Sequence, residues 1–194
     1  MNSKNIERHL KNLIKGNNNF IKNPTYIIER EKTKDHQDPC IIVISCSDSR
    51  VSIPTIFNYP HLGVFFEIKT AGQVLNSSDL ESIKYAVMNY DVLLIIMLGH
   101  TNCGAVIATV ESIVEPKKYN LRNEFPTITS SIAPSVEKVI RKHPSCLKKK
   151  LIYKSIIENI LDKTLQLEFL FGDKMYIVPA LYNLSSGEVT FFRN

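Results

Sequence analysis

The stretch "ISCSDSRVS", residues 44–52, places a thiol, a carboxylate and a guanidinium on alternate positions, at Cys46, Asp48 and Arg50. A thiol alone is typical of core packing, and a carboxylate beside an arginine is typical of an ion pair. All three together, directly after an apolar run, indicate a reactive site. A second such segment, "GHTNCG", follows another apolar run and carries His100 and Cys103 three positions apart.

Two thiolates and an imidazole form a ligand set that favours zinc, and Cys46, His100 and Cys103 would supply it. Three protein ligands leave the fourth tetrahedral position for water, which is typical of catalytic zinc sites. Either cysteine taken alone is better explained as a core residue, but the combination favours a metal site. Cys40 and Cys146 have no such neighbours and are interpreted as packing or surface thiols. The remaining histidines also lack suitable neighbours and are expected to be exposed: His9, His36, His61 and His143.

The sequence leaves three interpretations of Asp48 and Arg50 open. They could form an ion pair that only holds the loop. Beside a metal-activated water, a carboxylate fixed by Arg50 could also accept a hydrogen bond and orient the attacking oxygen. Asp48 could instead become the fourth metal ligand and block the site.

Composition predicts one soluble, cytoplasmic domain over residues 1–194, with 44% hydrophobic residues and a formal charge of +5. Four irregularly spaced cysteines without a secretory signal favour reduced thiols or metal ligands. No apolar run is long enough to cross a bilayer, so no membrane association is expected. The basic run at 148–150 is interpreted as a solvated face, and no nucleic-acid partner is expected.

The two reactive segments each follow a continuous apolar run, at 41–45 and 92–98, which is typical of parallel strands buried on both faces. Ligands in open α/β sheets bind at the carboxyl ends of such strands, so both segments are expected to face one crevice. The remaining expected elements are a helix at 5–21 that breaks at Asn17–Asn19, a strand at 64–69, a helix opened by a capping box at 78–81, helices at 105–114 and 151–171, and strands at 175–181 and 188–192.

Together, "CSDSR" and "HTNC" resemble the β-class carbonic anhydrases, with similarity from about residue 37 to 110 and again, weakly, at 177–189. The resemblance implies one zinc ion per chain, held by Cys46, His100 and Cys103, with Asp48 and Arg50 as a catalytic dyad. It implies reversible hydration of carbon dioxide to bicarbonate and a proton by attack of zinc-bound hydroxide.

The resemblance also extends to a substrate pocket. Gln37, Phe66 and Tyr85 stand where plant-like members of the family line their carbon dioxide pocket. Some members carry a tryptophan and an arginine that favour a closed, Asp-ligated zinc, and this chain has Val43 and Lys69 in those places. We therefore expect an open site near neutral pH.

The fold implied by the resemblance is a three-layer α/β domain. Its central, mostly parallel sheet has about four strands plus an antiparallel edge strand, and helices flank it. The implied assembly is a homodimer or a higher even-numbered homo-oligomer, in which a helical arm at 1–31 packs on the partner. Pocket residues would come from both subunits, so a monomer should be inactive. The family's Arg-Asn-x-x-Asn reads Lys69-Thr70-Ala71-Gly72-Gln73 here, a departure in the pocket wall or dimer contact.

Two other functions fit parts of the pattern. Related zinc enzymes hydrolyse carbon disulfide or carbonyl sulfide, but the set of Gln37, Phe66 and Tyr85 favours carbon dioxide. A zinc-binding sensor or assembly component would not need Asp48 and Arg50 beside an open coordination position. A cysteine phosphatase loop is excluded, because three residues separate Cys46 from Arg50 where that loop needs five.

Overall fold

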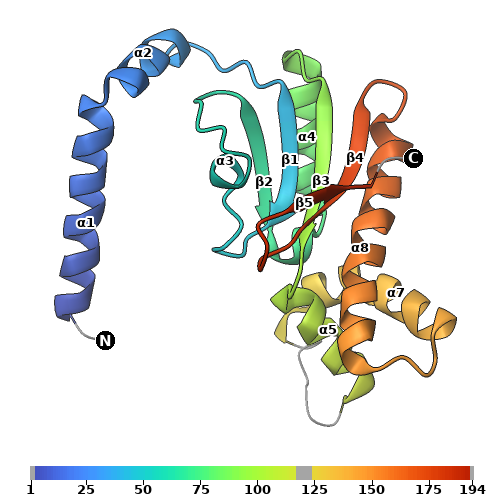
Figure 1. Cartoon of the computed structure of the whole chain (residues 1–194). Coiled ribbons are helices and arrows are strands. Elements are labelled where there is room, and N and C mark those ends of the chain that lie inside the picture. Colours follow the sequence, from blue (N-terminus) through green and yellow to red (C-terminus); the bar gives the residue numbers. More distant parts are fainter. Residues whose placement is uncertain (1–2, 117–123, 193–194) are drawn as a thin grey trace.

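The computed structural model describes residues 3–116 and 124–192, and residues 1 and 2 of the expected arm lie outside this range. Its five-stranded sheet has the order β2-β1-β3-β4-β5 (Figure 1). The strands are β1 (Ile41–Cys46), β2 (Phe65–Thr70), β3 (Leu94–His100), β4 (Tyr176–Tyr182) and β5 (Val189–Phe191). The first four are parallel, and β5 is antiparallel to β4. The predicted mixed α/β sheet is confirmed.

The central strands β1 and β3 are buried on both faces, as their continuous apolar runs predict. In β1, Ile42 and Ile44 belong to one apolar cluster, and Val43 between them belongs to a second cluster on the opposite face. Parallel pairing aligns Ser45 with Leu98, so the two strands end at the same edge of the sheet. Each strand lies within about two residues of its expected position.

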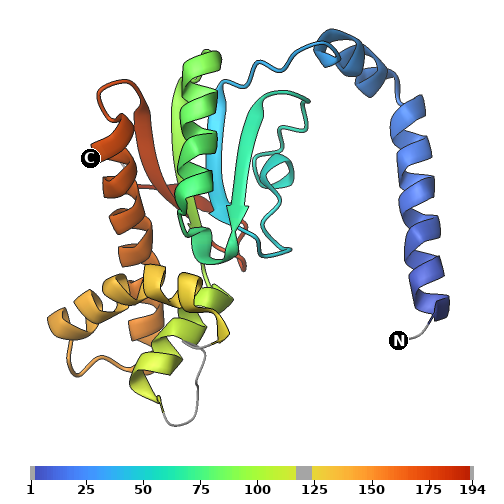
Figure 2. The same cartoon turned by 180° about the vertical axis from the view of Figure 1, so that it is seen from behind.

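The helices cover the two faces unequally. Helices α4 (Ser77–Asn89) and α8 (Lys148–Phe171) lie over one face, as Figure 2 shows. On the other face, the short α3 (Ile53–Ile56) packs against the sheet and carries Ile53 into the second apolar cluster (Figure 1). Helices α5 (Gly104–Val114) and α7 (Pro126–Lys142) pack together with α8 beyond the carboxyl ends of the strands.

Helices α4, α7 and α8 differ from what the sequence predicts. The capping box begins at Asn76, not at Ser78: the Asn76 side chain accepts from the Asp79 amide, and the Asp79 carboxylate accepts from the Asn76 amide. Helix α7 was not expected, because Pro134 and a run of Ser and Thr hide its buried stripe. The basic run is only partly a solvated face, since Lys148 forms ion pairs with Glu111 on α5 and with Glu115 directly after it.

The amino-terminal segment forms α1 (Ser3–Lys22) and α2 (Pro24–Thr33). The expected break at Asn17–Asn19 is wrong: α1 continues through the asparagines, and the chain turns at Asn23, which caps α2 by accepting from the Thr25 amide. Both views place α1 away from the sheet. Its apolar stripe is exposed, with Leu13 at 69%.

Helix α2 is attached to the body of the protein by Glu29. Its carboxylate pairs with His61 Nδ1 at 2.7 Å and accepts from the Leu62 amide at 3.1 Å. We expected His61 to be exposed and without a suitable neighbour, and only the exposure is correct. His9, His36 and His143 are also exposed, and Cys40 and Cys146 are half-buried. Among the described residues, no helix is both long and apolar enough to cross a membrane.

Candidate metal centre

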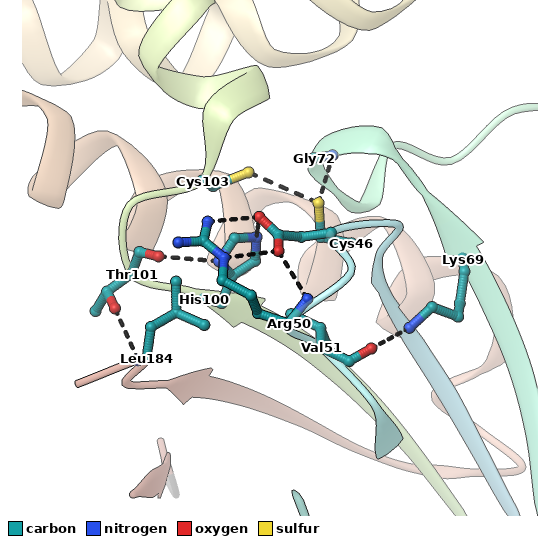
Figure 3. A network of polar contacts seen from close by, with 10 residues as sticks. Cys46, Arg50, Val51, Lys69, Gly72, His100, Thr101, Cys103 and Leu184 are labelled. Carbon is teal, nitrogen blue, oxygen red and sulfur yellow. Dashed lines mark hydrogen bonds and ion pairs between the residues drawn. The ribbon is translucent and has the colours of Figure 1, made fainter. Parts of the chain in front are cut away.

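Three potential metal ligands meet at the carboxyl edge of the sheet. Cys46 is the last residue of β1, His100 is the last residue of β3, and Cys103 directly precedes α5. Their ligand atoms all lie within 4.8 Å of one another (Figure 3). The three side chains are buried, with exposed fractions of 5%, 0% and 1%. The structure thus brings together the residues that the sequence singled out from two distant segments.

A tight turn carries the chain from His100 to Cys103. Asn102 adopts a left-handed backbone with φ of 54°, a conformation that asparagine tolerates better than most residues. The turn delivers Cys103 to the N-cap position of α5. The positive end of the helix dipole and the amides of Ala105 and Val106 stabilise a thiolate there, while burial and the Cys46 sulfur oppose it.

The hydrogen bonds of His100 determine which nitrogen is free to bind a metal. Its Nδ1 lies 2.9 Å from the Thr101 carbonyl oxygen, which can only accept, so Nδ1 carries the proton. Nε2 then presents its lone pair, and this buried atom has no hydrogen-bond partner among the described residues. Thr101 is itself fixed, because its amide donates to Tyr182 and its hydroxyl accepts from the Leu184 amide. Such support is typical of metal-binding histidines.

The two thiols lie close enough together to share one bound cation. Their sulfur atoms are 3.9 Å apart, and the Gly72 amide also donates to Cys46 at 3.3 Å. Donation from Cys103, with that from Gly72, lowers the pKa of the Cys46 thiol. The pKa of Cys103 is raised, because its proton is held by the Cys46 sulfur and because the thiol is buried. A bound dication would stabilise both thiolates, so the donor set of two thiols and an orphaned imidazole nitrogen fits zinc.

Asp48 lies beside this group and is held by Arg50. The Arg50 side chain donates to both carboxylate oxygens, at 2.9 Å and 2.7 Å, and the Arg50 amide adds a third bond at 3.0 Å. These hydrogen bonds hold the pKa of the Asp48 carboxyl well below its usual range. Oδ2 of Asp48 is 3.9 Å from His100 Nε2. The ion pair expected from the sequence therefore exists and borders the metal-ligand group.

The departure at 69–73 is part of the same site. Lys69 donates its ammonium to the carbonyl of Val51, just beyond Arg50, and Gly72 donates to Cys46 (Figure 3). Asn159, on α8, donates to the carbonyl of Gly72 at 3.1 Å. Sequence reasoning missed the contribution of Gly72, for which the Ala-Gly break was the available signal. For Asn159 the sequence offered no signal.

The expected substrate-pocket residues lie away from the metal-ligand group of their own chain. Phe66 on β2 aligns with Ile42, four residues before Cys46, which corresponds to roughly 13 Å along the strand. Gln37 donates to the Tyr90 hydroxyl at 3.0 Å, and Tyr85 shares a hydrogen bond with the same hydroxyl at 3.1 Å. Tyr90, which sequence reasoning missed, thus joins two of the three. One chain alone does not bring this set to the metal-ligand group.

A buried Cys-His-Cys group at the carboxyl edge of a mostly parallel sheet, beside an arginine-bound aspartate, places this chain among α/β proteins with a candidate catalytic metal centre. The family model described as carbonic anhydrase matches residues 41–189. The chain therefore belongs to the carbonic anhydrase family.

Curated relatives and solved structures agree with this assignment. The chain is 42% identical over 93 residues to a carbonic anhydrase of Mycolicibacterium smegmatis, covering 47% of this chain and 45% of the relative. It is 46% identical over 77 residues to carbonic anhydrase 2 of Mycobacterium tuberculosis, covering 40% and 37%. These alignments span less than half the length of either relative.

Solved β-carbonic anhydrases share the fold. The structure of the β-carbonic anhydrase CcaA superposes with a TM-score of 0.81 at 24% identity, covering 95% of each chain. A Coccomyxa β-carbonic anhydrase in complex with acetazolamide gives a TM-score of 0.76 at 21% identity, covering 94% of this chain and 84% of that one. The chain thus has the β-carbonic anhydrase fold over most of its length.

Proposed function

We propose that this protein catalyses the reversible hydration of carbon dioxide to bicarbonate and a proton, with one zinc ion per chain held by Cys46, His100 and Cys103. The observation that carries the proposal is the convergence of these three ligand atoms within 4.8 Å, beside a carboxylate fixed by Arg50. A site that only stored or sensed metal would not need such a carboxylate.

Zinc, when bound, supplies a nucleophile by lowering the pKa of water, and the protein supplies the rest. Arg50 keeps Asp48 ionised and turned in one direction, so the carboxylate can only accept hydrogen bonds. Asp48 therefore accepts a hydrogen bond from the attacking oxygen at one of its Oδ atoms. This bond orients the oxygen so that a lone pair points toward the substrate carbon. Thr101 fixes the imidazole of His100 in the tautomer that leaves Nε2 free.

We further propose that the site is open near neutral pH, as in plant-like members of the family. Three hydrogen bonds hold both oxygens of the Asp48 carboxylate to Arg50, which opposes its becoming a metal ligand. The positions at which a tryptophan and an arginine favour a closed site carry Val43, which is fully buried among apolar residues, and Lys69, which donates to Val51. Val43 and Lys69 therefore do not form a comparable anion-binding pair.

The active form is proposed to be a homodimer or a higher even-numbered homo-oligomer. Phe66 pairs with Ile42, four residues before Cys46, and Gln37 and Tyr85 are both hydrogen-bonded to Tyr90, so a second copy would supply this set to the metal-ligand group. The exposed apolar stripe of α1 provides a surface for that contact. Hydrogen bonds from His61 and Leu62 to Glu29 direct the arm away from its own sheet. Tetrameric β-carbonic anhydrases of Sordaria macrospora share the fold at a TM-score of 0.68.

The test uses two cysteine variants measured in parallel. Cys46→Ser should lose zinc and carbon dioxide hydration together, because it removes a buried ligand. Cys146→Ser, at a half-buried thiol outside the site, is the matched control and should retain both. Loss of hydration in Cys46→Ser with zinc content unchanged would contradict the ligand assignment. Zinc-dependent hydrolysis of carbon disulfide or carbonyl sulfide without hydration of carbon dioxide would contradict the proposed reaction.

A further inference from the structure

The Gly72 backbone lies between a proposed zinc ligand and helix α8. Its amide donates to the Cys46 sulfur at 3.3 Å, and its carbonyl accepts from Asn159 Nδ2 at 3.1 Å. Both contacts are buried, and the second joins residues 87 positions apart in sequence. A side chain on α8 thus reaches the metal-ligand group through one backbone residue.

The backbone at this point has an unusual conformation that its surroundings maintain. Gly72 and Gln73 both adopt left-handed conformations, with φ of 68° and 45°. Such a conformation is unfavourable for a glutamine, and it persists where neighbouring contacts fix it. A side chain at Gly72 would meet Ile132 of α7 at 2.7 Å and Ala105 of α5 at 3.0 Å. Packing therefore confines Gly72 from one side, and Asn159 holds its carbonyl.

Asn159 is a buried polar residue whose side-chain amide is only partly hydrogen-bonded. Its side chain is fully buried in α8, where an asparagine is a poorer helix former than leucine or alanine. Its described hydrogen bond is the one to Gly72, and its Oδ1 has no partner among the described residues. Burying an amide with half of its hydrogen bonds unmade is unfavourable for folding alone. The position suggests a role in the site.

We propose that Asn159 is a positioning residue of the metal centre, which fixes the Gly72 backbone so that its amide points at the Cys46 sulfur. This inference rests on the zinc-binding part of the proposed function. An amide that donates to a ligand sulfur fixes the direction of the sulfur lone pairs and withdraws charge from the thiolate. Asn159 acts through Gly72 and touches neither the metal nor the substrate.

Removal of the Asn159 amide should weaken zinc binding by about 10- to 100-fold, the usual effect of losing an outer hydrogen bond at a metal site. It should also change the sulfur-to-metal electronic transition. A merely structural role for Asn159 would lower stability without moving the electronic transition, so the spectrum distinguishes the two roles.

The experiment compares Asn159→Leu with Thr164→Val in the full-length protein. Thr164 is a matched control on the same helix, because it is buried and donates to a backbone carbonyl, that of Ile160, within α8. Zinc affinity is measured by competition with a chromophoric chelator. The thiolate-to-cobalt absorption is recorded after substitution with Co²⁺, and unfolding of each metal-free variant in urea gives its stability. Asn159→Ala serves as a second variant if Asn159→Leu does not fold.

The expected result is a 10- to 100-fold increase in the zinc dissociation constant for Asn159→Leu, with a displaced cobalt absorption. Thr164→Val should keep a dissociation constant within about twofold of the wild type and an unchanged spectrum. The proposal is overturned if the Asn159 variants show the wild-type spectrum, or if their loss of zinc affinity is no greater than that of Thr164→Val. Tight zinc binding without carbon dioxide hydration would refute the proposed enzyme activity but not this role.

Discussion

Replacing Gly72 with alanine tests how closely the backbone beside Cys46 is fitted to the metal centre. The added Cβ would lie 2.7 Å from Ile132 Cδ1 and 3.0 Å from Ala105 Cβ, both closer than ordinary contact. It would also force an alanine into a left-handed backbone with φ of 68°. We expect the variant to be less stable and to bind zinc more weakly, because any shift of this segment moves the amide that donates to Cys46.

The magnitude follows from two separate costs. A left-handed conformation costs a residue with a Cβ roughly 1–2 kcal/mol. Overpacking a buried site adds about 1–3 kcal/mol. Gly187 isolates the first cost, since its φ is 78° but nothing lies within 4 Å of an added Cβ. In a chain of this size each kcal/mol lowers the melting temperature by roughly 2–4 °C.

The assay is thermal and urea unfolding of Gly72→Ala and Gly187→Ala, with zinc affinity measured on the same samples. Gly72→Ala should be less stable than Gly187→Ala by about 1–3 kcal/mol. Only Gly72→Ala should lose zinc affinity. Equal stability losses in the two variants, with zinc binding unchanged in both, would refute the claim that packing against Ile132 and Ala105 sets the geometry of the Cys46 contact.

Three further predictions concern the site and the arm. Asp48→Asn should keep its zinc but lose hydration activity by roughly 100-fold or more, and full activity in a zinc-replete sample would remove Asp48 from the mechanism. The pKa of Asp48 is depressed, because Arg50 hydrogen-bonds the ionised form, so its contribution to stability is present above the unfolded pKa near 4 and is lost only as the pH falls toward the lower folded pKa. Asp48 therefore stays ionised throughout an assay between pH 6 and 9. Hydration activity should rise on the alkaline side, because two thiolates offset the charge of a bound dication and leave the pKa of its water higher. A plateau of activity already reached at pH 6.5 would contradict this prediction. Leu13→Asp, on the exposed stripe of α1, should yield an inactive monomer in gel filtration with parallel assay. The control Lys15→Asp, on the same helix, should leave the oligomer intact. Fully active monomers would argue against a shared pocket.

The elements that present the proposed ligands could be predicted because their signals are local. The apolar runs before Cys46 and His100 predict strands that are buried on both faces. Parallel strands of one sheet have their carboxyl ends at the same edge. The motifs that follow them then had to meet. Helix boundaries were less predictable, since Asn76, Ser78 and Asp79 compete to cap α4 and only the backbone geometry selects among them.

Contacts between distant segments could not be predicted. Nothing in the sequence near Asn159 connects it to Gly72, and the fold brings the Asn159 side chain on α8 within hydrogen-bond distance of the segment that follows β2. The helix around Pro134 was missed because proline and β-branched residues weaken the helical pattern, while packing against α8 stabilises it. Packing does not explain the helix at Asn17–Asn19, because these residues are exposed; α1 continues through them because the cost of asparagine in a helix is small.

Residues 69–73 differ from the family's Arg-Asn-x-x-Asn pattern, but this difference does not remove the contact of the segment with Cys46. The contact that this segment makes with Cys46 comes from the backbone amide of Gly72, which a change of side chain at Lys69 or Thr70 does not remove. Lys69 adds a second tie by donating to Val51 in the loop that follows Arg50. The segment therefore keeps its contact with the proposed ligand while its side chains differ from the usual family pattern.

The most direct test of the central claim is stopped-flow hydration of carbon dioxide as a function of zinc content. Metal-free protein would be titrated with zinc while the rate and the bound metal are measured on the same samples. Hydration activity should rise in proportion to bound zinc and stop rising at one ion per chain. Saturation of the Cys46, His100 and Cys103 site with zinc while hydration stays at the uncatalysed rate would contradict the proposed zinc-dependent reaction.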